Sequence, residues 1–136
     1  GRMMPNRDIA NAIRQYDKAI QLDPDEADYY SHRGGAYHYL ARRVDSPDQF
    51  QNAIADYSKA IQIGPDNVLY YKHRGGAYSA LGQHQNAIND YTKAIQLDPY
   101  DATAYNNRGN RYRNLGQTAN ADADKTMACS LDSQWC

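Results

Sequence analysis

The stretch Tyr71-Lys72-His73-Arg74-Gly75-Gly76-Ala77-Tyr78 decides the fold of this chain, because the chain contains three versions of it. An earlier copy spans residues 30–37 and a later copy spans residues 105–112. Each copy holds an aromatic residue, then Arg-Gly, then a tyrosine. Tyr71 and Tyr105 lie 34 residues apart, and self-similarity at such a period predicts stacked structural repeats.

Apolar residues follow each copy at the spacing of one helix face. The second copy is followed by Ala87, Tyr91, Ala94 and Ile95, and a proline comes next at position 99. The earlier copy has the same order, and an equivalent stripe opens the chain. The complete pattern predicts helices over residues 6–22, 26–43, 47–63, 67–81, 84–97, 101–115 and 118–132.

The order aromatic-x-x-Arg-Gly-x-x-Tyr, then Ala-x-x-x-Tyr, then Pro resembles the tetratricopeptide (TPR) repeat. Tyrosine stands for the usual Trp of that repeat, and arginine stands for its usual Leu. The resemblance implies an all-α fold, a right-handed α-solenoid of antiparallel helix pairs with about seven helices. It also implies a binding function, in which the hollow side of the helix array holds a segment of another protein.

Equivalent positions of successive repeats, called columns below, divide the chain into repeats. We expect one TPR domain over residues 1–136. Its first columns match the second helix of a repeat, and its last columns replace apolar residues with Asp122 and Lys125. A terminal repeat needs a polar outer face, so these two residues predict a cap. The expected divisions are a half repeat at 6–24, a repeat at 27–67, a repeat at 68–101 and a capping repeat at 102–135.

The repeat at 27–67 contains a seven-residue insertion near residues 41–47, because Ala53 comes seven residues later than the spacing of the third copy requires. Seven residues are almost two helical turns. We therefore expect each helix of this pair to be about one turn longer. Ser46, Pro47 and Gln49 predict the start of the second helix, with Ser46 as N-cap and Gln49 completing a capping box.

Composition limits the classes of partner. The net charge is −1 and the pI is about 6.4, values that do not favour a nucleic-acid ligand. No apolar run approaches the length of a membrane span, so membrane insertion is not expected. Cys129 and Cys136 would lie about 10 Å apart on a helix and could pair only if the tail folds back. Two reduced thiols and a cytoplasmic location are therefore favoured.

A concave groove is implied by the TPR resemblance, and the face of each first helix opposite the packing side would line it. Gly35 and Gly76 would hollow its floor, whereas Gly34, Gly75 and Gly109 allow close helix packing. An alternative is that Gly35 and Gly76 are simply tolerated. The candidate groove residues are Ser31, His32, Gly35, Tyr39, Lys72, His73, Gly76, Asn106, Asn107, Asn110, Arg113 and Asn114.

Asparagines at helical spacing, from Asn106 to Asn114, offer both donors and acceptors to the backbone of an extended peptide. Arg113, with Lys72, would supply a cationic contact for an acidic residue. A merely solvated face would have a similar composition. Some TPR co-chaperones hold a terminal carboxylate with Lys, Asn, Asn, Lys and Arg; the corresponding columns here hold Ser31, Gly35, His73, Thr103 and Asn107. That particular ligand is therefore disfavoured.

Catalytic and metal-binding motifs are not found in the sequence. The glycine pairs lie inside predicted helices rather than in a phosphate-binding loop. His32 and His73 occupy equivalent positions of successive repeats, but packed helices are about 10 Å apart, too far for one zinc ion. We expect no enzyme activity, no cofactor and no metal.

The function predicted from these residues is a non-enzymatic adaptor or scaffold that binds a peptide segment of a partner protein. The alternative is a structural module that self-associates, as a homodimer, through the apolar stripe of its first helix. That stripe contains Ile9, Ile13, Tyr16 and Ile20. A third possibility is that the chain is a fragment of a longer array.

Overall fold

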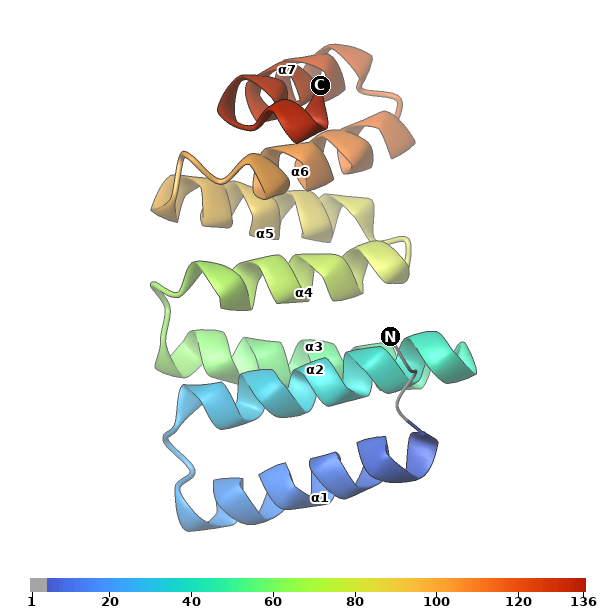
Figure 1. Ribbon diagram of the computed structural model, residues 1–136, viewed down its shortest axis with the longest axis vertical. Helices are drawn as coiled ribbons and strands as arrows, with labels where there is room; N and C mark the ends of the chain where they lie inside the picture. Colours follow the sequence, from blue (N-terminus) through green and yellow to red (C-terminus); the bar gives the residue numbers. More distant parts are fainter. Residues whose placement is uncertain (1–4) are drawn as a thin grey trace. The chain divides into compact units, whose positions relative to one another are not determined.

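The computed structural model describes residues 5–136, which form two compact units (Figure 1). The amino-terminal unit extends to Pro65 and contains α1 (Asn6–Leu22), α2 (Ala27–Val44) and α3 (Pro47–Ile63). The carboxy-terminal unit begins at Asp66 and contains α4 (Val68–Ala80), α5 (His84–Leu97), α6 (Ala102–Asn114), α7 (Thr118–Leu131) and the short 3-10 helix η1 (Ser133–Trp135). Residues 5–136 contain no β-strand.

All seven predicted helices are present, and each end lies within one residue of its predicted position. The agreement follows from local chemistry, since an apolar period of 3.6 residues and stops at Pro or Gly are both readable along the chain. Gly82 and Gly116, with φ of 73° and 75°, form the turns before α5 and α7. Glycine adopts this left-handed conformation without the steric cost that a side chain brings.

In the amino-terminal unit, α2 packs along α3, and α1 packs on α2. The α2/α3 core contains Phe50, Ala53, Tyr57 and Ala60. Both helices are long: α2 has 18 residues against 13 in α4, and α3 has 17 against 14 in α5. In the extended part of the pair, the His38 and Phe50 rings meet edge to face with centroids 5.3 Å apart.

The start of α3 departs from one expectation. Ser46 is the N-cap residue and Pro47 is the first helical residue, as predicted, but the Ser46 side chain makes no capping hydrogen bond. The Gln49 side chain instead accepts a hydrogen bond from Asn52 at 3.2 Å. The predicted capping box is therefore wrong, because Gln49 is bonded within its own helix.

In the carboxy-terminal unit, α4 packs on α5, α5 on α6 and α6 on α7. Ala87, Ile88, Tyr91 and Ala94 of α5 are all buried between their neighbours. The helices approach closely where a glycine faces a large side chain. A Cβ atom added to Gly75 would lie 2.9 Å from Tyr91 Cε1.

One arginine and one aspartate connect the two helices of every complete pair. The Arg74 guanidinium donates two hydrogen bonds to the Asp90 carboxylate, at 2.8 and 2.7 Å. Arg108 holds Asp124 in the same way at 2.8 and 2.7 Å, and Arg33 holds Asp56 at 2.9 and 2.8 Å. The arginine stands in place of the usual leucine of the repeat, but this bidentate ion pair was not predicted from the sequence.

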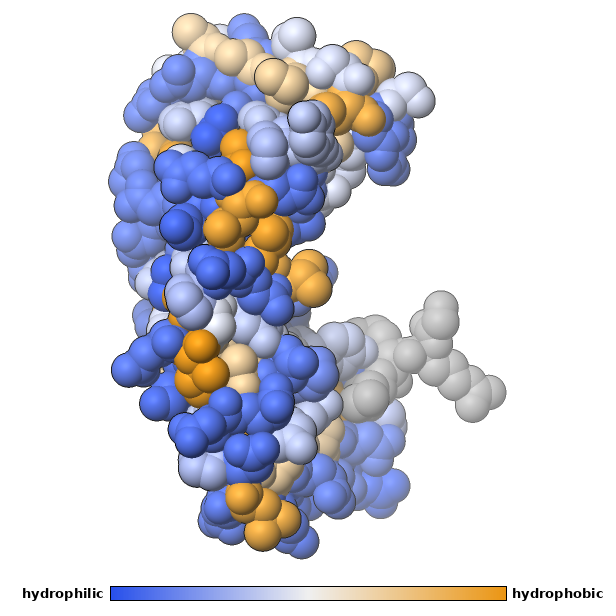
Figure 2. Space-filling view, turned by 90° about the vertical axis from the view of Figure 1, so that its left-hand side faces the viewer, coloured by the Kyte–Doolittle hydropathy of each residue, from blue (hydrophilic) through white to orange (hydrophobic). Residues whose placement is uncertain are grey.

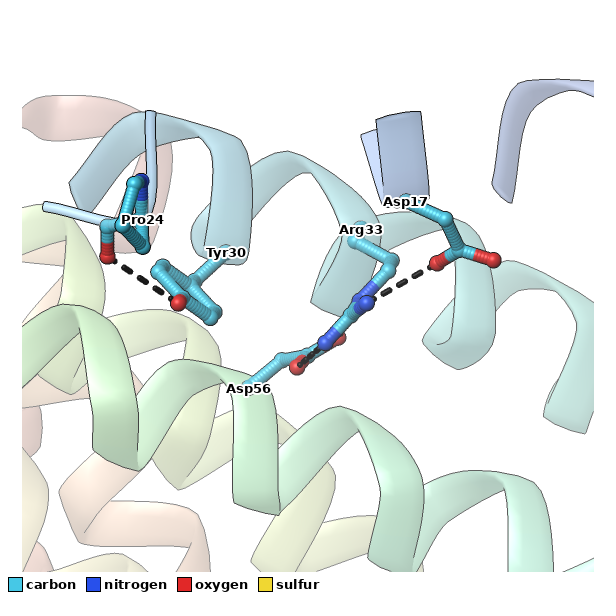
Figure 3. Close-up of polar contacts among 5 residues, drawn as sticks. All are labelled: Asp17, Pro24, Tyr30, Arg33 and Asp56. Atoms are coloured by element: carbon cyan, nitrogen blue, oxygen red, sulfur yellow. Dashed lines mark hydrogen bonds and ion pairs between the residues drawn. The ribbon is translucent and has the colours of Figure 1, made fainter. Parts of the chain in front are cut away.

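The arginine also reaches the preceding helix. Arg33 donates to Asp17 of α1 at 2.8 Å, and Figure 3 shows it lying between Asp17 and Asp56. The equivalent Arg108 donates to Thr92 of α5 at 3.2 Å. The hydrogen bond to the paired aspartate is the largest cause that raises the pKa of Arg33 and Arg108, and Asp17 raises that of Arg33 further. Arg33 and Arg108 therefore each connect three consecutive helices.

Repeat tyrosines fasten the loops between helix pairs. The Tyr30 hydroxyl donates to the Pro24 carbonyl at 3.0 Å (Figure 3), and the Tyr105 hydroxyl donates to the Pro99 carbonyl at 3.1 Å. Both bonds join residues six positions apart. The tyrosine column thus combines an apolar ring with a polar tip that binds the loop.

The cysteines correct another expectation. η1 turns the tail back onto α7, and Cys129 and Cys136 form a disulfide with their Cα atoms 4.6 Å apart. The prediction of two reduced thiols is therefore wrong, because the last residues leave the helix. Disulfides are typical of oxidising environments, so the cysteine pair no longer favours a cytoplasmic location. Within the described residues, no helix has the length and apolar character that a bilayer span requires.

Candidate peptide-binding surface

The predicted groove residues of α2 differ in accessibility. Ser31 is only 7% exposed, so its hydroxyl is not open to a ligand. His32 is exposed and its ring lies 5.7 Å from the Tyr16 ring of α1. Gly35 has open space beside it, since an added Cβ would meet only the Tyr57 hydroxyl, at 3.9 Å. Tyr39 is exposed.

In α4, the predicted groove residues are Lys72, His73 and Gly76. His73 is exposed and Gly76 is half-buried. Lys72 forms an ion pair with Asp101, the N-cap residue of α6, at 2.8 Å. The predicted cationic contact from Lys72 would therefore have to compete with this intramolecular carboxylate.

The asparagine row of α6 is divided by α7. Asn106 is 9% exposed, and the Lys125 ammonium donates to the side-chain oxygens of Asn106 and Asn110, each at 2.5 Å. Asn106 is thus buried inside the unit rather than open to a peptide, which corrects its place in the predicted groove. Asn107 and Asn110 are half-buried, and Asn114 is exposed.

Lys125 does not lie on a polar outer face, as was expected for a residue of the capping repeat. Its side chain turns inward onto α6 at the column that holds Tyr57 and Tyr91 in the earlier pairs. Burial lowers the pKa of Lys125, and the neighbouring Arg113 and Arg111 charges lower it further. Lysine can do this because its long apolar stem replaces the tyrosine ring while its ammonium reaches amide oxygens. Asp122, by contrast, is exposed and pairs with Arg113 at 3.2 Å.

A small pocket opens between α4, α5 and α6. Its volume is about 180 Å³, and its lining residues are Ser79, Tyr91, Asn107, Asn110 and Arg111. Two predicted groove residues, Asn107 and Asn110, meet here. Burial raises the pKa of Tyr91, so its hydroxyl stays neutral despite the opposing effects of Ser79 and Arg111.

Arg111 was missed by the sequence analysis. The signal was present, because Arg111 takes the place of Ala36 and Ala77 in the two earlier copies. Ala77 is fully buried, whereas the longer Arg111 extends to α5, where its Nη1 lies 3.5 Å from Nδ1 of His84. A residue that differs in type from its equivalents in the other repeats thus indicates a different role for that side chain.

The apolar stripe of α1 is partly covered. Ile9 is 1% exposed, so it is already packed within the amino-terminal unit. Ile13, Tyr16 and Ile20 are half-buried. The self-association surface predicted from these four residues would therefore be smaller than expected, and Ile9 would not contribute to it.

Hydrophilic residues cover most of the face drawn in Figure 2, with hydrophobic residues between them. Within residues 5–136, the most exposed large apolar side chains are Leu22 and Tyr100, both beside loops between helices. Among the described residues, no three His, Cys, Asp or Glu side chains are grouped so that they could hold a metal ion. Polar recognition through amides and charges is the chemistry that this surface offers.

Helical hairpins repeated in register, with a polar surface on their first helices, define a class of repeat proteins that bind other chains. Comparison with known families places the chain within that class. The family described as TPR repeat matches residues 8–40 and 75–116, more than half of the chain. The protein belongs to the TPR repeat family, and its fold is an all-α TPR solenoid.

Solved structures agree with this assignment. The Arabidopsis OM64 TPR domain is 30% identical, with a TM-score of 0.70, over 79% of this chain and 84% of that one. MamA MSR-1 is similar in fold, with a TM-score of 0.77 at 19% identity, over 94% of this chain and 70% of that one. The first TPR of Spaghetti (RPAP3), bound to an HSP90 peptide, gives a TM-score of 0.72 at 23% identity, with 82% of each chain covered. No curated protein sequence matches the chain.

Proposed function

We propose that this chain is a non-enzymatic module that binds a peptide segment of a partner protein. The observation that carries the proposal is the pocket of the carboxy-terminal unit, where amide side chains of α6 are open beside α4. Amides at helical spacing can bond the backbone of an extended peptide without demanding one sequence. The OM64 domain and the peptide-bound RPAP3 domain share the fold, which supports this reading.

The residues proposed for the contact are those of the predicted groove that are still accessible. In α6 they are Asn107, Asn110, Arg113 and Asn114. Arg113 is more than half exposed, and so is its partner Asp122, so the guanidinium can exchange this contact for a ligand carboxylate at little cost. Within the same unit, His73 and Gly76 of α4 are the counterparts of Asn107 and Asn110. On α2 of the amino-terminal unit, the counterparts of Asn107, Asn110 and Asn114 are His32, Gly35 and Tyr39.

The test is a double substitution, Asn107→Ala with Arg113→Ala. Peptides selected from a displayed random library would be titrated calorimetrically against the unchanged protein and the variant. We expect a loss of affinity of about tenfold or more, since two polar contacts are removed. The matched control is Gln85→Ala with Asn89→Ala, an exposed hydrogen-bonded pair on α5, which should leave affinity unchanged. Equal affinity of the groove variant and the unchanged protein would refute this surface.

Self-association through α1 is the second candidate, because part of the apolar stripe on that helix is not fully covered within the unit. Ile13, Tyr16 and Ile20 would form the contact. We expect a dimer whose population rises with concentration, measured by light scattering, and a monomer after Ile13→Asp. A chain that stays monomeric at high concentration excludes this candidate.

A further inference from the structure

The pocket between α4, α5 and α6 is lined only by neutral and cationic side chains. Its five lining residues include one guanidinium, two amides and two hydroxyls, and no carboxylate. At about 180 Å³ it is smaller than the roughly 300–1,000 Å³ of sites that enclose whole small molecules. Its size and polarity therefore suit a single polar group projecting from a larger ligand.

Arg111 is the charged residue of this pocket and lacks an acidic partner. Arg33, Arg74 and Arg108 each hold a buried aspartate. Among the described residues, no carboxylate lies within ion-pair distance of Arg111, whose polar neighbour is Nδ1 of His84. A half-buried guanidinium without a counter-ion provides five donors in a planar fork that matches a carboxylate.

The hydrogen bond from Lys125 fixes the orientation of the Asn110 amide in the pocket. An ammonium group only donates, so the atom of Asn110 that it contacts at 2.5 Å must be the amide oxygen. The oxygen is therefore occupied, and the amide nitrogen is the polar atom that Asn110 retains for the pocket. Asn110 and Arg111 consequently both present donors, the arrangement that an anion requires.

We propose that this pocket binds the carboxylate of an aspartate or glutamate side chain in the partner peptide, through Arg111, Asn110 and Asn107. The proposal rests on the proposed function, and it adds the chemical class of the ligand residue. Arg111 and Asn110 lie outside the columns of the co-chaperone clamp, whereas Asn107 occupies its last column, so the site differs from that clamp in its cation and in one of its two amides. Ser79 contributes no donor, since its hydroxyl donates to the Gly75 carbonyl at 2.9 Å.

The experiment titrates isotope-labelled protein with three blocked tripeptides, acetyl-Gly-X-Gly-amide, in which X is glutamate, glutamine or phosphoserine. Side-chain N–H signals of Arg111, Asn107 and Asn110 report on the pocket directly. We expect the glutamate peptide to bind in the millimolar range and to shift these signals. We expect the glutamine peptide to leave them unchanged and the phosphoserine peptide to bind no more tightly than the glutamate peptide.

Single substitutions identify the side chains that bind the glutamate peptide. Arg111→Gln should weaken binding of the glutamate peptide by about tenfold or more, because the charge-assisted hydrogen bonds are lost. Arg14→Gln, on α1, makes the same change in net charge. Among the residues described, Arg14 hydrogen-bonds only to Asn11 of its own helix, so this variant should bind the glutamate peptide normally. Asn110→Ala is a second variant of the pocket, and circular dichroism checks that each variant folds.

Equal shifts with glutamate and glutamine, no binding of the glutamate peptide, or tighter binding of phosphoserine would each overturn the carboxylate assignment. These outcomes are separate from failure of the proposed function. Library peptides that bind and depend on Asn107 and Arg113, while the glutamate probe does not bind, would leave the module a peptide binder. Failure of every library peptide to bind would refute the proposed function instead.

Discussion

Replacing Asp90 with alanine is expected to lower the free energy of unfolding by about 3–5 kcal/mol. Asp90 is 4% exposed and accepts both hydrogen bonds of the Arg74 fork. Its removal takes away the carboxylate that accepts these two bonds, so the desolvation of the Arg74 guanidinium is offset less well. Urea denaturation followed by circular dichroism measures the loss.

The matched control is Asp122→Ala, which removes the same residue type from an ion pair that is exposed. The Arg113 and Asp122 side chains are 56% and 65% exposed, so we expect a change of about 0–1 kcal/mol. Adding Arg74→Leu to Asp90→Ala should recover part of the lost stability, because the largely buried guanidinium charge is then gone. If Asp90→Ala and Asp122→Ala are equally mild, the Arg–Asp pair does not hold the hairpin together.

The tandem glycines of α2 should respond to alanine in opposite directions. A Cβ at Gly34 would lie 2.9 Å from Tyr57 Cε1 and 3.2 Å from Asp56 Cβ. Both neighbours are buried, so α2 and α3 must move apart, and we expect a loss of about 1–3 kcal/mol. Thermal unfolding of the purified variant gives the size of this loss.

Gly35→Ala is the control one residue away. Its added Cβ would meet only the Tyr57 hydroxyl at 3.9 Å, an ordinary contact. Because glycine is a poor helix former, this change should stabilise the chain by about 0.5–1 kcal/mol. If Gly34→Ala is neutral or stabilising, Gly34 is not required for the close approach of α2 and α3.

The helices were predictable because their signals are local. Prolines, turn glycines and an apolar residue every third or fourth position define α1 to α7 without reference to any partner. The repeat period then identified the family, since chemistry recurring at 34 residues implies one hairpin copied along the chain. Even the small-residue column at Gly34, Gly75 and Gly109 was expected, because the TPR resemblance implies it.

The candidate site was predicted less completely, and Asn106 shows why. Sequence spacing placed Asn106 and Asn110 on the open face of α6. The structure brings Lys125 of α7 onto both side chains, which buries the first and orients the second. Arg111 carried a signal, since it replaces the alanines of the earlier copies, but only the structure shows that it reaches α5. A helical periodicity describes one helix, whereas a binding surface depends on which neighbour reaches it.

The sequence by itself thus determined the helices, their order and the repeat family, because these depend on spacings within about 34 residues that recur. The tertiary structure alone decided which polar groups are already engaged. Arg74 with Asp90, Lys125 with Asn110, and Cys129 with Cys136 are pairs whose members carry no local mark of their partner. Such pairs depend on distances and directions between side chains, which exist only once helices pack and the tail turns back.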